Sequence, residues 1–154
     1  MTLPLPSNGG KFKQGFFNPK NPLKYIGQKP IRYLSSWELK FFRFCDDNAN
    51  VVEWASEAVI IPYVSPVDGK VHRYYTDGII AIKETTGIKK YIVEIKPSAQ
   101  TKPPVKGKKR QSTMVYETIR YAQNQAKWTA AKQWCSKHGY EFLILTEGEL
   151  GITR

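Results

Sequence analysis

The spacing of apolar residues predicts a helix before the middle of the chain. Ser35 or Ser36 provides a start signal, and Leu39, Phe42 and Cys45 recur at helical spacing. A polar run follows directly after Cys45, so we expect the helix to end there.

Three stretches after this helix have the composition of β-strands. Residues 58–64 are apolar and β-branched and predict a buried strand. Residues 70–82 alternate between polar and apolar, and residues 89–96 follow after the turn signal Glu84-Thr85-Thr86-Gly87. The last two stretches predict a β-hairpin.

A second, longer helix is predicted from about Thr113 to His138. Lys137 and His138 in its last turn and Gly139 just beyond it form a common C-terminal signature. One face of this helix is expected to be apolar, formed by Val115, Ile119, Ala122, Ala126, Ala130 and Trp134. Residues 142–145 predict a final strand, which completes an α/β domain with a mixed β-sheet flanked by helices.

The 154 residues carry a formal net charge of +11, and the whole excess lies in two segments that contain no acid. The first, residues 1–34, holds six basic residues: Lys11, Lys13, Lys20, Lys24, Lys29 and Arg32. The second, residues 97–113, holds five: Lys102, Lys106, Lys108, Lys109 and Arg110. Both segments are rich in proline and glycine, so neither is expected to form long regular elements.

Two interpretations of these basic segments stay open. They are solvated arms, or they bind a polyanion, because counterion release from phosphates favours clustered Lys and Arg. The first arm also carries several aromatic residues, which could contact nucleic acid, dock on the domain or bind a protein partner. We divide the chain into this arm, residues 1–33, and a domain, residues 34–154, that includes the second segment as a loop.

Several classes of protein are not expected. No apolar run approaches the roughly 20 residues of a membrane span, and the N-terminus lacks the apolar core of a signal peptide, so we expect neither membrane insertion nor secretion. Two cysteines and two histidines predict neither a disulfide framework nor a zinc site. No small-molecule cofactor is expected either.

The predicted hairpin brings three polar residues together. Glu94 and Lys96 lie on one face of their strand, because side chains alternate in a strand, and Ile95 points to the other face. If the turn centres on Thr85-Thr86, Asp77 lies opposite Glu94. A turn centred one residue later would place Asp77 opposite Lys96 instead.

Asp77, Glu94 and Lys96 could form an ordinary surface salt bridge or a metal site. Two opposed carboxylates repel each other, and Glu94 lies in an apolar strand where an unpaired charge is costly. Mg²⁺, with Mn²⁺ as an alternative, prefers carboxylate oxygens and water as ligands. We favour the metal site, in which the ion would activate water against a phosphodiester and Lys96 would orient that water.

The same residues resemble the PD-(D/E)xK nuclease superfamily, with Asp77 on one strand and Glu94-x-Lys96 on the next. Thr76 stands where the superfamily motif has proline. The resemblance implies a restriction-endonuclease-like core in the order α-β-β-β-α-β, with the basic N-terminal arm as an extension. Residues 33–147 also look like the head-completion nucleases of T-even-type phages and the TnsA-type transposon nucleases. This narrower resemblance rests on Ser35-Ser36-Trp37-Glu38, Ser56-Glu57, Ile61-Pro62-Tyr63, Arg73-Tyr74-Tyr75-Thr76-Asp77, Val93-Glu94-Ile95-Lys96-Pro97 and Lys127-Trp128.

The resemblance adds candidate site residues. Glu38 matches an acidic residue that often completes the metal site, and the carbonyl of Ile95 is a further metal ligand. Ser35-x-x-Glu38 is also a capping box, in which Glu38 would bind the backbone of Ser35 instead. Lys127 could reach the scissile phosphate or pack its aliphatic part beside Trp128.

The sequence therefore supports two hypotheses for the function of the protein. The first is a Mg²⁺-dependent DNA endonuclease with little sequence specificity, acting in phage head completion after genome packaging, or alternatively in transposition or repair. The second is a structural neck or head-closure adaptor that binds DNA and portal proteins without turnover. Both imply double-stranded DNA and portal or neck proteins as partners, in the virion or the host cytoplasm. The residues expected to bind DNA are Lys102, Lys106, Lys108, Lys109, Arg110 and Lys127.

Overall fold

The computed structural model describes residues 14–152 and contains two α-helices, two 3₁₀ helices and eight strands within that range. The elements follow the order β1 (Gly15–Phe17), η1 (Pro22–Lys24), β2 (Ile31–Tyr33), α1 (Ser36–Asp47), β3 (Val51–Ser56), β4 (Ile60–Val64), β5 (Val71–Tyr75), β6 (Gly78–Glu84), β7 (Gly87–Ile95), η2 (Ser98–Thr101), α2 (Gln111–His138) and β8 (Glu141–Leu145). Lys11 and Lys13 of the predicted arm lie outside the described residues. Within them, no helix is long and apolar enough to cross a membrane.

A four-stranded mixed sheet in the order β3-β6-β7-β8 forms the centre of the domain. β3, β6 and β7 are antiparallel, and β8 pairs with β7 in parallel after the crossover through α2. The predicted α/β class with a mixed sheet is therefore confirmed.

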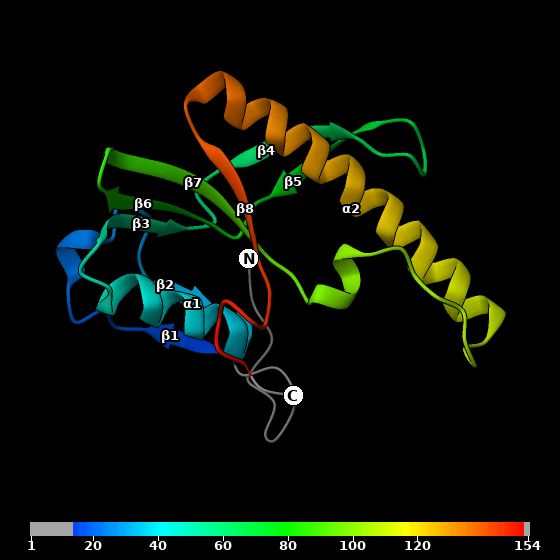
Figure 1. Ribbon diagram of the computed structural model, residues 1–154, viewed down its shortest axis with the longest axis horizontal. Helices are drawn as coiled ribbons and strands as arrows, with labels where there is room; N and C mark the ends of the chain where they lie inside the picture. The colour runs from blue at the N-terminus through cyan, green and yellow to red at the C-terminus, as the bar shows by residue number, and fades with distance from the viewer. Residues whose placement is uncertain (1–13, 153–154) are drawn as a thin grey trace.

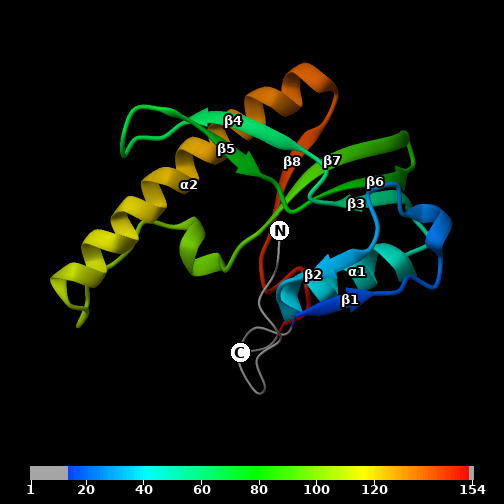
Figure 2. The same cartoon turned by 180° about the vertical axis from the view of Figure 1, so that it is seen from behind.

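Different elements cover the two faces of this sheet (Figures 1 and 2). On one face lie α1 and the short β1–β2 ribbon, which enclose a core that includes Phe42, Trp54 and Val93. On the other face lie α2 and the β4–β5 ribbon, which bury Ile61 and Trp128. Consecutive residues of β7 thus point to different cores.

The β6–β7 hairpin adopts the first of the two predicted registers. Glu84 pairs with Gly87, so the turn centres on Thr85-Thr86, and Gly78 pairs with Val93. This register continues to Asp77 opposite Glu94 and excludes the alternative with Asp77 opposite Lys96.

The strand predictions were incomplete. β3 was not predicted, although it forms one edge of the main sheet. The stretch 70–82 is two strands in different sheets, because buried Thr76 breaks away to bond the carbonyl of Val59 through its hydroxyl at 2.8 Å. The stretch 58–64 begins only at Ile60 and buries alternate residues, since one face of the β4–β5 ribbon is open to solvent.

The predicted apolar face of α2 is confirmed only in the C-terminal half of the helix, where Ala126, Ala130 and Trp134 pack against the core around Trp128. Val115 and Ile119 are exposed, whereas the buried residues are Asn124, Trp128, Ala131 and Cys135. Only the C-terminal half of α2 packs on the sheet and the β4–β5 ribbon, and its N-terminal half extends past them (Figure 1). Helical spacing alone cannot reveal where the supporting surface ends.

Most of the described aromatic residues of the first basic segment dock on the domain: Phe17, Tyr25 and Tyr33 pack in or against its core, whereas Phe16 is exposed. Phe17 and Tyr25 pack edge-on against Trp54, with ring centroids 6.0 and 4.7 Å away. The carboxylate of Asp46 accepts hydrogen bonds from the backbone amides of Lys20 and Asn21 at 2.8 and 2.9 Å. Docking on the domain is thus observed for Phe17, Tyr25 and Tyr33, and binding of nucleic acid or of a protein partner by this segment stays a prediction.

Candidate active site

Asp77 lies at the point where the chain leaves β5 and enters β6. Its backbone amide donates to the carbonyl of Val93 at 3.0 Å, which fixes it against β7. Its carboxylate oxygen Oδ2 accepts a hydrogen bond from the amide of Ile95 at 2.7 Å. The side chain is thereby held beside the end of β7, where Glu94 begins the ExK sequence.

Glu94 is a buried carboxylate, only 6% exposed, on the face of β7 that meets α2. Its Oε2 accepts hydrogen bonds from the hydroxyl of Tyr74 on β5 and from the indole Nε1 of Trp128 on α2, the latter at 3.2 Å. Its Oε1 lies 3.8 Å from the ammonium of Lys96. Three separate elements therefore orient one carboxylate, with Oε2 occupied by donors and Oε1 facing the lysine.

The surroundings of Asp77 favour its protonated form. Burial, followed by the charge of Glu94 and a hydrogen bond with it, raises the pKa of Asp77 well above its usual range. The amide of Ile95 opposes this shift, and the more distant charge of Glu38 adds to it. A proton shared within the pair, or a cation, would relieve the repulsion.

Glu38 caps α1 in the structure. Its Oε2 accepts from the backbone amide of Leu34 at 3.0 Å, while the hydroxyl of Ser35 accepts from the amide of Glu38 at 3.2 Å. The reciprocal cap was predicted, but the carboxylate reaches Leu34 rather than the backbone of Ser35. Burial raises the pKa of Glu38, and the charge of Glu57 adds to the effect.

Glu38 and the central pair do not form a ready-made metal centre. Among residues 14–152, no three His, Cys, Asp or Glu side chains are grouped so that they could hold an ion. The structure thus brings Asp77, Glu94 and Lys96 together and leaves Glu38 on its helix end, close enough only for its charge to act on Asp77.

Lys127 and Trp128 follow one another on α2, yet only Trp128 bonds the carboxylate pair. The ammonium of Lys127 lies 5.8 Å from the ring centroids of both Tyr63 and Tyr74. Lys127 therefore packs on the rings of Tyr63 and Tyr74, and the hydroxyl of Tyr74 in turn bonds Glu94. The hydrogen bonds from Tyr74 and Trp128 were not predicted, because no residue spacing reveals which aromatic donors reach a buried carboxylate across two elements.

The basic loop, defined here as residues 97–110, leaves directly from the end of β7. Its basic residues Lys102, Lys106, Lys108, Lys109 and Arg110 are all exposed. Lys109 is paired with Glu117 of α2 at 2.9 Å. The other four cations carry no ion pair within the described residues.

The chain is similar in sequence to known nucleases. Residues 48–147, which run from the end of α1 through β8, match the family "TnsA-like endonuclease N terminal". The chain is also 40% identical over 144 residues to the "Head completion nuclease" of Enterobacteria phage T4, covering 88% of this chain and 92% of that protein. The matched region contains Asp77, Glu94 and Lys96. The chain belongs to the TnsA-like endonuclease family and is a nuclease related over most of its length to the T4 head completion nuclease.

Proposed function

We propose that this protein is a metal-dependent DNA endonuclease that acts in phage head completion. The observation that carries the proposal is the buried pair Asp77 and Glu94, with Lys96 beside it at the end of β7. The role in head completion is taken from the T4 relative, whose name states it. Portal or neck proteins as partners, and a place in the virion or host cytoplasm, are part of the same proposal.

The donor set fits a hard divalent cation such as Mg²⁺ or Mn²⁺. Both side chains carry carboxylates, the type of ligand that these ions prefer, and burial together with the charge of Glu94 raises the pKa of Asp77. Asp77 Oδ2 and Glu94 Oε2 are already hydrogen-bonded, so the other oxygen of each group is the one that would bind the ion. The carbonyl of Ile95 and the carboxylate of Glu38 are further candidate ligands. A bound cation would polarise a phosphodiester and lower the pKa of a bound water.

The protein's own residues supply the remaining steps. Lys96, whose side chain is about one quarter exposed, reaches both Glu94 and solvent. It orients the attacking water or stabilises charge on the phosphate as that charge develops. The exposed cations of the basic loop, most of which lie near the N-terminal end of α2, hold the DNA backbone farther along the substrate, and phosphate contacts of this kind carry no sequence information. Because the contacts are to phosphates, we expect cleavage to show little sequence specificity.

The test is cleavage of linear and supercoiled DNA with Mg²⁺, with Mn²⁺ and with a chelator. Asp77→Asn and Glu94→Gln are expected to reduce metal-dependent cleavage at least 100-fold, because each removes a charged ligand. Glu141→Gln, at the exposed first residue of β8 and outside the site, is the matched control and is expected to cleave normally. Equal cleavage by all variants would reject this active site. Salt-sensitive DNA binding without cleavage by the wild type would favour the adaptor function.

A further inference from the structure

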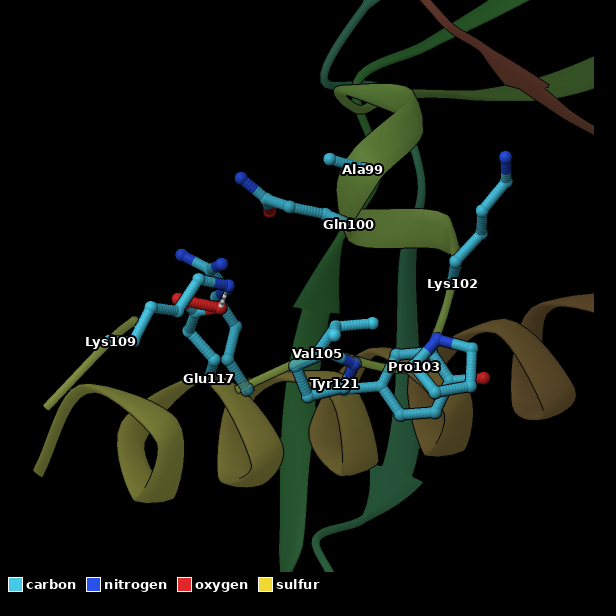
Figure 3. Close-up of a pocket in the computed structure, with 10 residues that line it drawn as sticks. Ala99, Gln100, Lys102, Pro103, Val105, Lys109, Glu117 and Tyr121 are labelled. Carbon is cyan, nitrogen blue, oxygen red and sulfur yellow. Dashed lines mark hydrogen bonds and ion pairs between the residues drawn. The ribbon is translucent and has the colours of Figure 1, made fainter. Parts of the chain in front are cut away.

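A pocket lies between η2, the basic loop and the N-terminal half of α2, away from the carboxylate pair (Figure 3). Its volume is about 310 Å³, at the lower end of the roughly 300–1,000 Å³ typical of small-ligand sites. A ligand that fills it is therefore about the size of one nucleotide rather than a longer fragment.

The apolar and the polar residues that line this pocket lie on different parts of its wall. Pro103, Val105 and Tyr121 gather on the side next to α2, and Ala99 faces them from η2 (Figure 3). Val105 is 75% exposed, so its apolar side chain is accessible at the mouth of the pocket. These residues offer an apolar surface that is wide enough for a planar ring.

Polar groups surround the apolar surface. Gln100 extends from η2 toward the end of the pocket where Lys109 and Glu117 form their ion pair (Figure 3). Lys102 and Arg120 add two more cations to the lining. Three cations against one carboxylate favour an anionic ligand, and the amide of Gln100 can both donate and accept hydrogen bonds.

We propose that this pocket takes one unpaired nucleotide of the DNA substrate, with its base on the apolar surface and its phosphates against the cations. The inference rests on the proposed nuclease function and specifies the substrate further. A base inside a duplex is stacked and paired, so it could enter only after costly flipping, whereas an unpaired base enters freely. Single-stranded nucleic acid is commonly bound in this way, through a basic groove and aromatic stacking.

The position of the pocket along α2 sets its distance from the cleavage site. Trp128, which bonds Glu94, lies seven residues after Tyr121 and eleven after Glu117. At 1.5 Å per residue these separations are about 10 and 16 Å along the helix. With a rise of about 3.4 Å per nucleotide, the unpaired nucleotide lies roughly three to five nucleotides from the scissile phosphate. The preferred substrate is therefore DNA with a single-stranded segment next to the cut.

The experiment measures DNA binding by fluorescence anisotropy in chelator, where no cleavage occurs. Three DNAs are compared: a blunt duplex, the same duplex with a short single-stranded extension, and that duplex with an extension lacking bases. Extensions at the 5′ and 3′ ends are tested separately. The wild type is expected to bind the extension with bases about fivefold or more tightly than either other DNA, since stacking of one base contributes on this scale.

Val105→Asp places a negative charge in the pocket and is expected to abolish the preference for the extension with bases. Val115→Asp introduces the same charge at an exposed position of α2 outside the pocket, and it is expected to keep the preference. Equal binding of all three DNAs, a preference that persists without bases, or equal loss in both variants would each overturn the proposal. Failure of the nuclease function would appear separately, as absent cleavage with Mg²⁺.

Discussion

The two central carboxylates differ in what holds them. Asp77 receives one backbone amide, from Ile95, while Glu94 receives two side-chain donors, from Tyr74 and Trp128. The positive charge of Lys96 balances the two carboxylates only in part, because its ammonium lies 3.8 Å from Glu94 Oε1 and is partly exposed to solvent. The free energy of folding therefore includes a cost for placing both groups together, which metal binding would offset.

This cost predicts a pH-dependent stability change for Asp77→Asn in metal-free protein. A raised pKa means that folding is penalised once pH exceeds the unfolded value near 4, and the penalty is complete above the folded pKa. Asn removes the ionisation and keeps an acceptor for Ile95. We expect the variant to be more stable than wild type at pH 7, with the gain vanishing near pH 4. Chemical denaturation across this pH range measures it.

Asp68→Asn is the control of opposite sign. The amide of Lys70 and the side chain of His72 lower the pKa of Asp68, so its ionised form favours the folded state. We expect no gain in stability from this substitution at pH 7. A neutral or destabilising effect of Asp77→Asn at pH 7 would contradict the account of the pair.

The hydrogen bonds to Glu94 predict an effect on metal affinity. Tyr74→Phe removes the hydroxyl that orients Oε2 and is expected to weaken Mn²⁺ binding about tenfold, as loss of an outer-shell partner commonly does. Calorimetric titration of Mn²⁺ measures the change. Tyr75→Phe, on the exposed neighbouring residue, is expected to bind Mn²⁺ like wild type. Equal affinities for wild type and Tyr74→Phe would remove the positioning role.

At the scale of elements, the first turn of α1 contains a residue, Glu38, that is both part of the helix cap and a candidate metal ligand. Both Glu and Gln can serve as the acceptor in a capping box, whereas only Glu carries a charge. Glu38→Gln is therefore expected to retain the stability of wild type, and Glu38→Ala to lose about 1 kcal/mol. If Glu38 also binds the metal, both variants lose cleavage to a similar degree. Full cleavage by Glu38→Gln would restrict Glu38 to capping.

The start of β6 requires glycine because of close packing. A Cβ at Gly78 would lie 2.9 Å from the carbonyl oxygen of Ala55 and 2.9 Å from the ring of Phe41. We expect Gly78→Ala to destabilise the protein by about 1–3 kcal/mol, since the backbone must shift next to Asp77. Thermal unfolding measures this loss. Gly148→Ala, whose Cβ would meet only Thr146 Oγ1 at 3.9 Å, is expected to be neutral. Equal effects would contradict the packing argument.

The hairpin that carries the site could be predicted, and the reasons are local. The turn residues and the alternation of β7 predict the hairpin and restrict its register to two choices without any distant contact, and the structure shows the one in which Glu84 pairs with Gly87. The break before Asp77 could not be predicted, because Thr76 leaves the strand to bond Val59, seventeen residues away. The hydrogen bonds that Tyr74 and Trp128 donate to Glu94 could not be predicted for the same reason, because they depend on packing between separate elements.

At the scale of the whole molecule, the basic loop determines how DNA binding responds to salt. Each phosphate contact that releases a counterion changes the slope of log affinity against log salt by about 0.9. We expect Lys106→Ala and Lys108→Ala each to reduce this slope by about that amount. Lys109→Ala is expected to reduce it less, because Glu117 already neutralises Lys109. Binding titrations at several salt concentrations measure the slopes, and equal slopes for all three variants would contradict this assignment.

The long helix also has a mechanical consequence. α2 has 28 residues, about 42 Å in length, and its buried residues begin only at Asn124. Trp128 therefore lies close to the point where the packed part of α2 begins. The N-terminal half of the helix, before that point, lines the pocket and adjoins the basic loop. A force on that half of the helix, from DNA or from a neighbouring protein, would act on the hydrogen bond from the indole of Trp128 to the carboxylate of Glu94. We expect cleavage to depend on whether the far end of the helix is occupied.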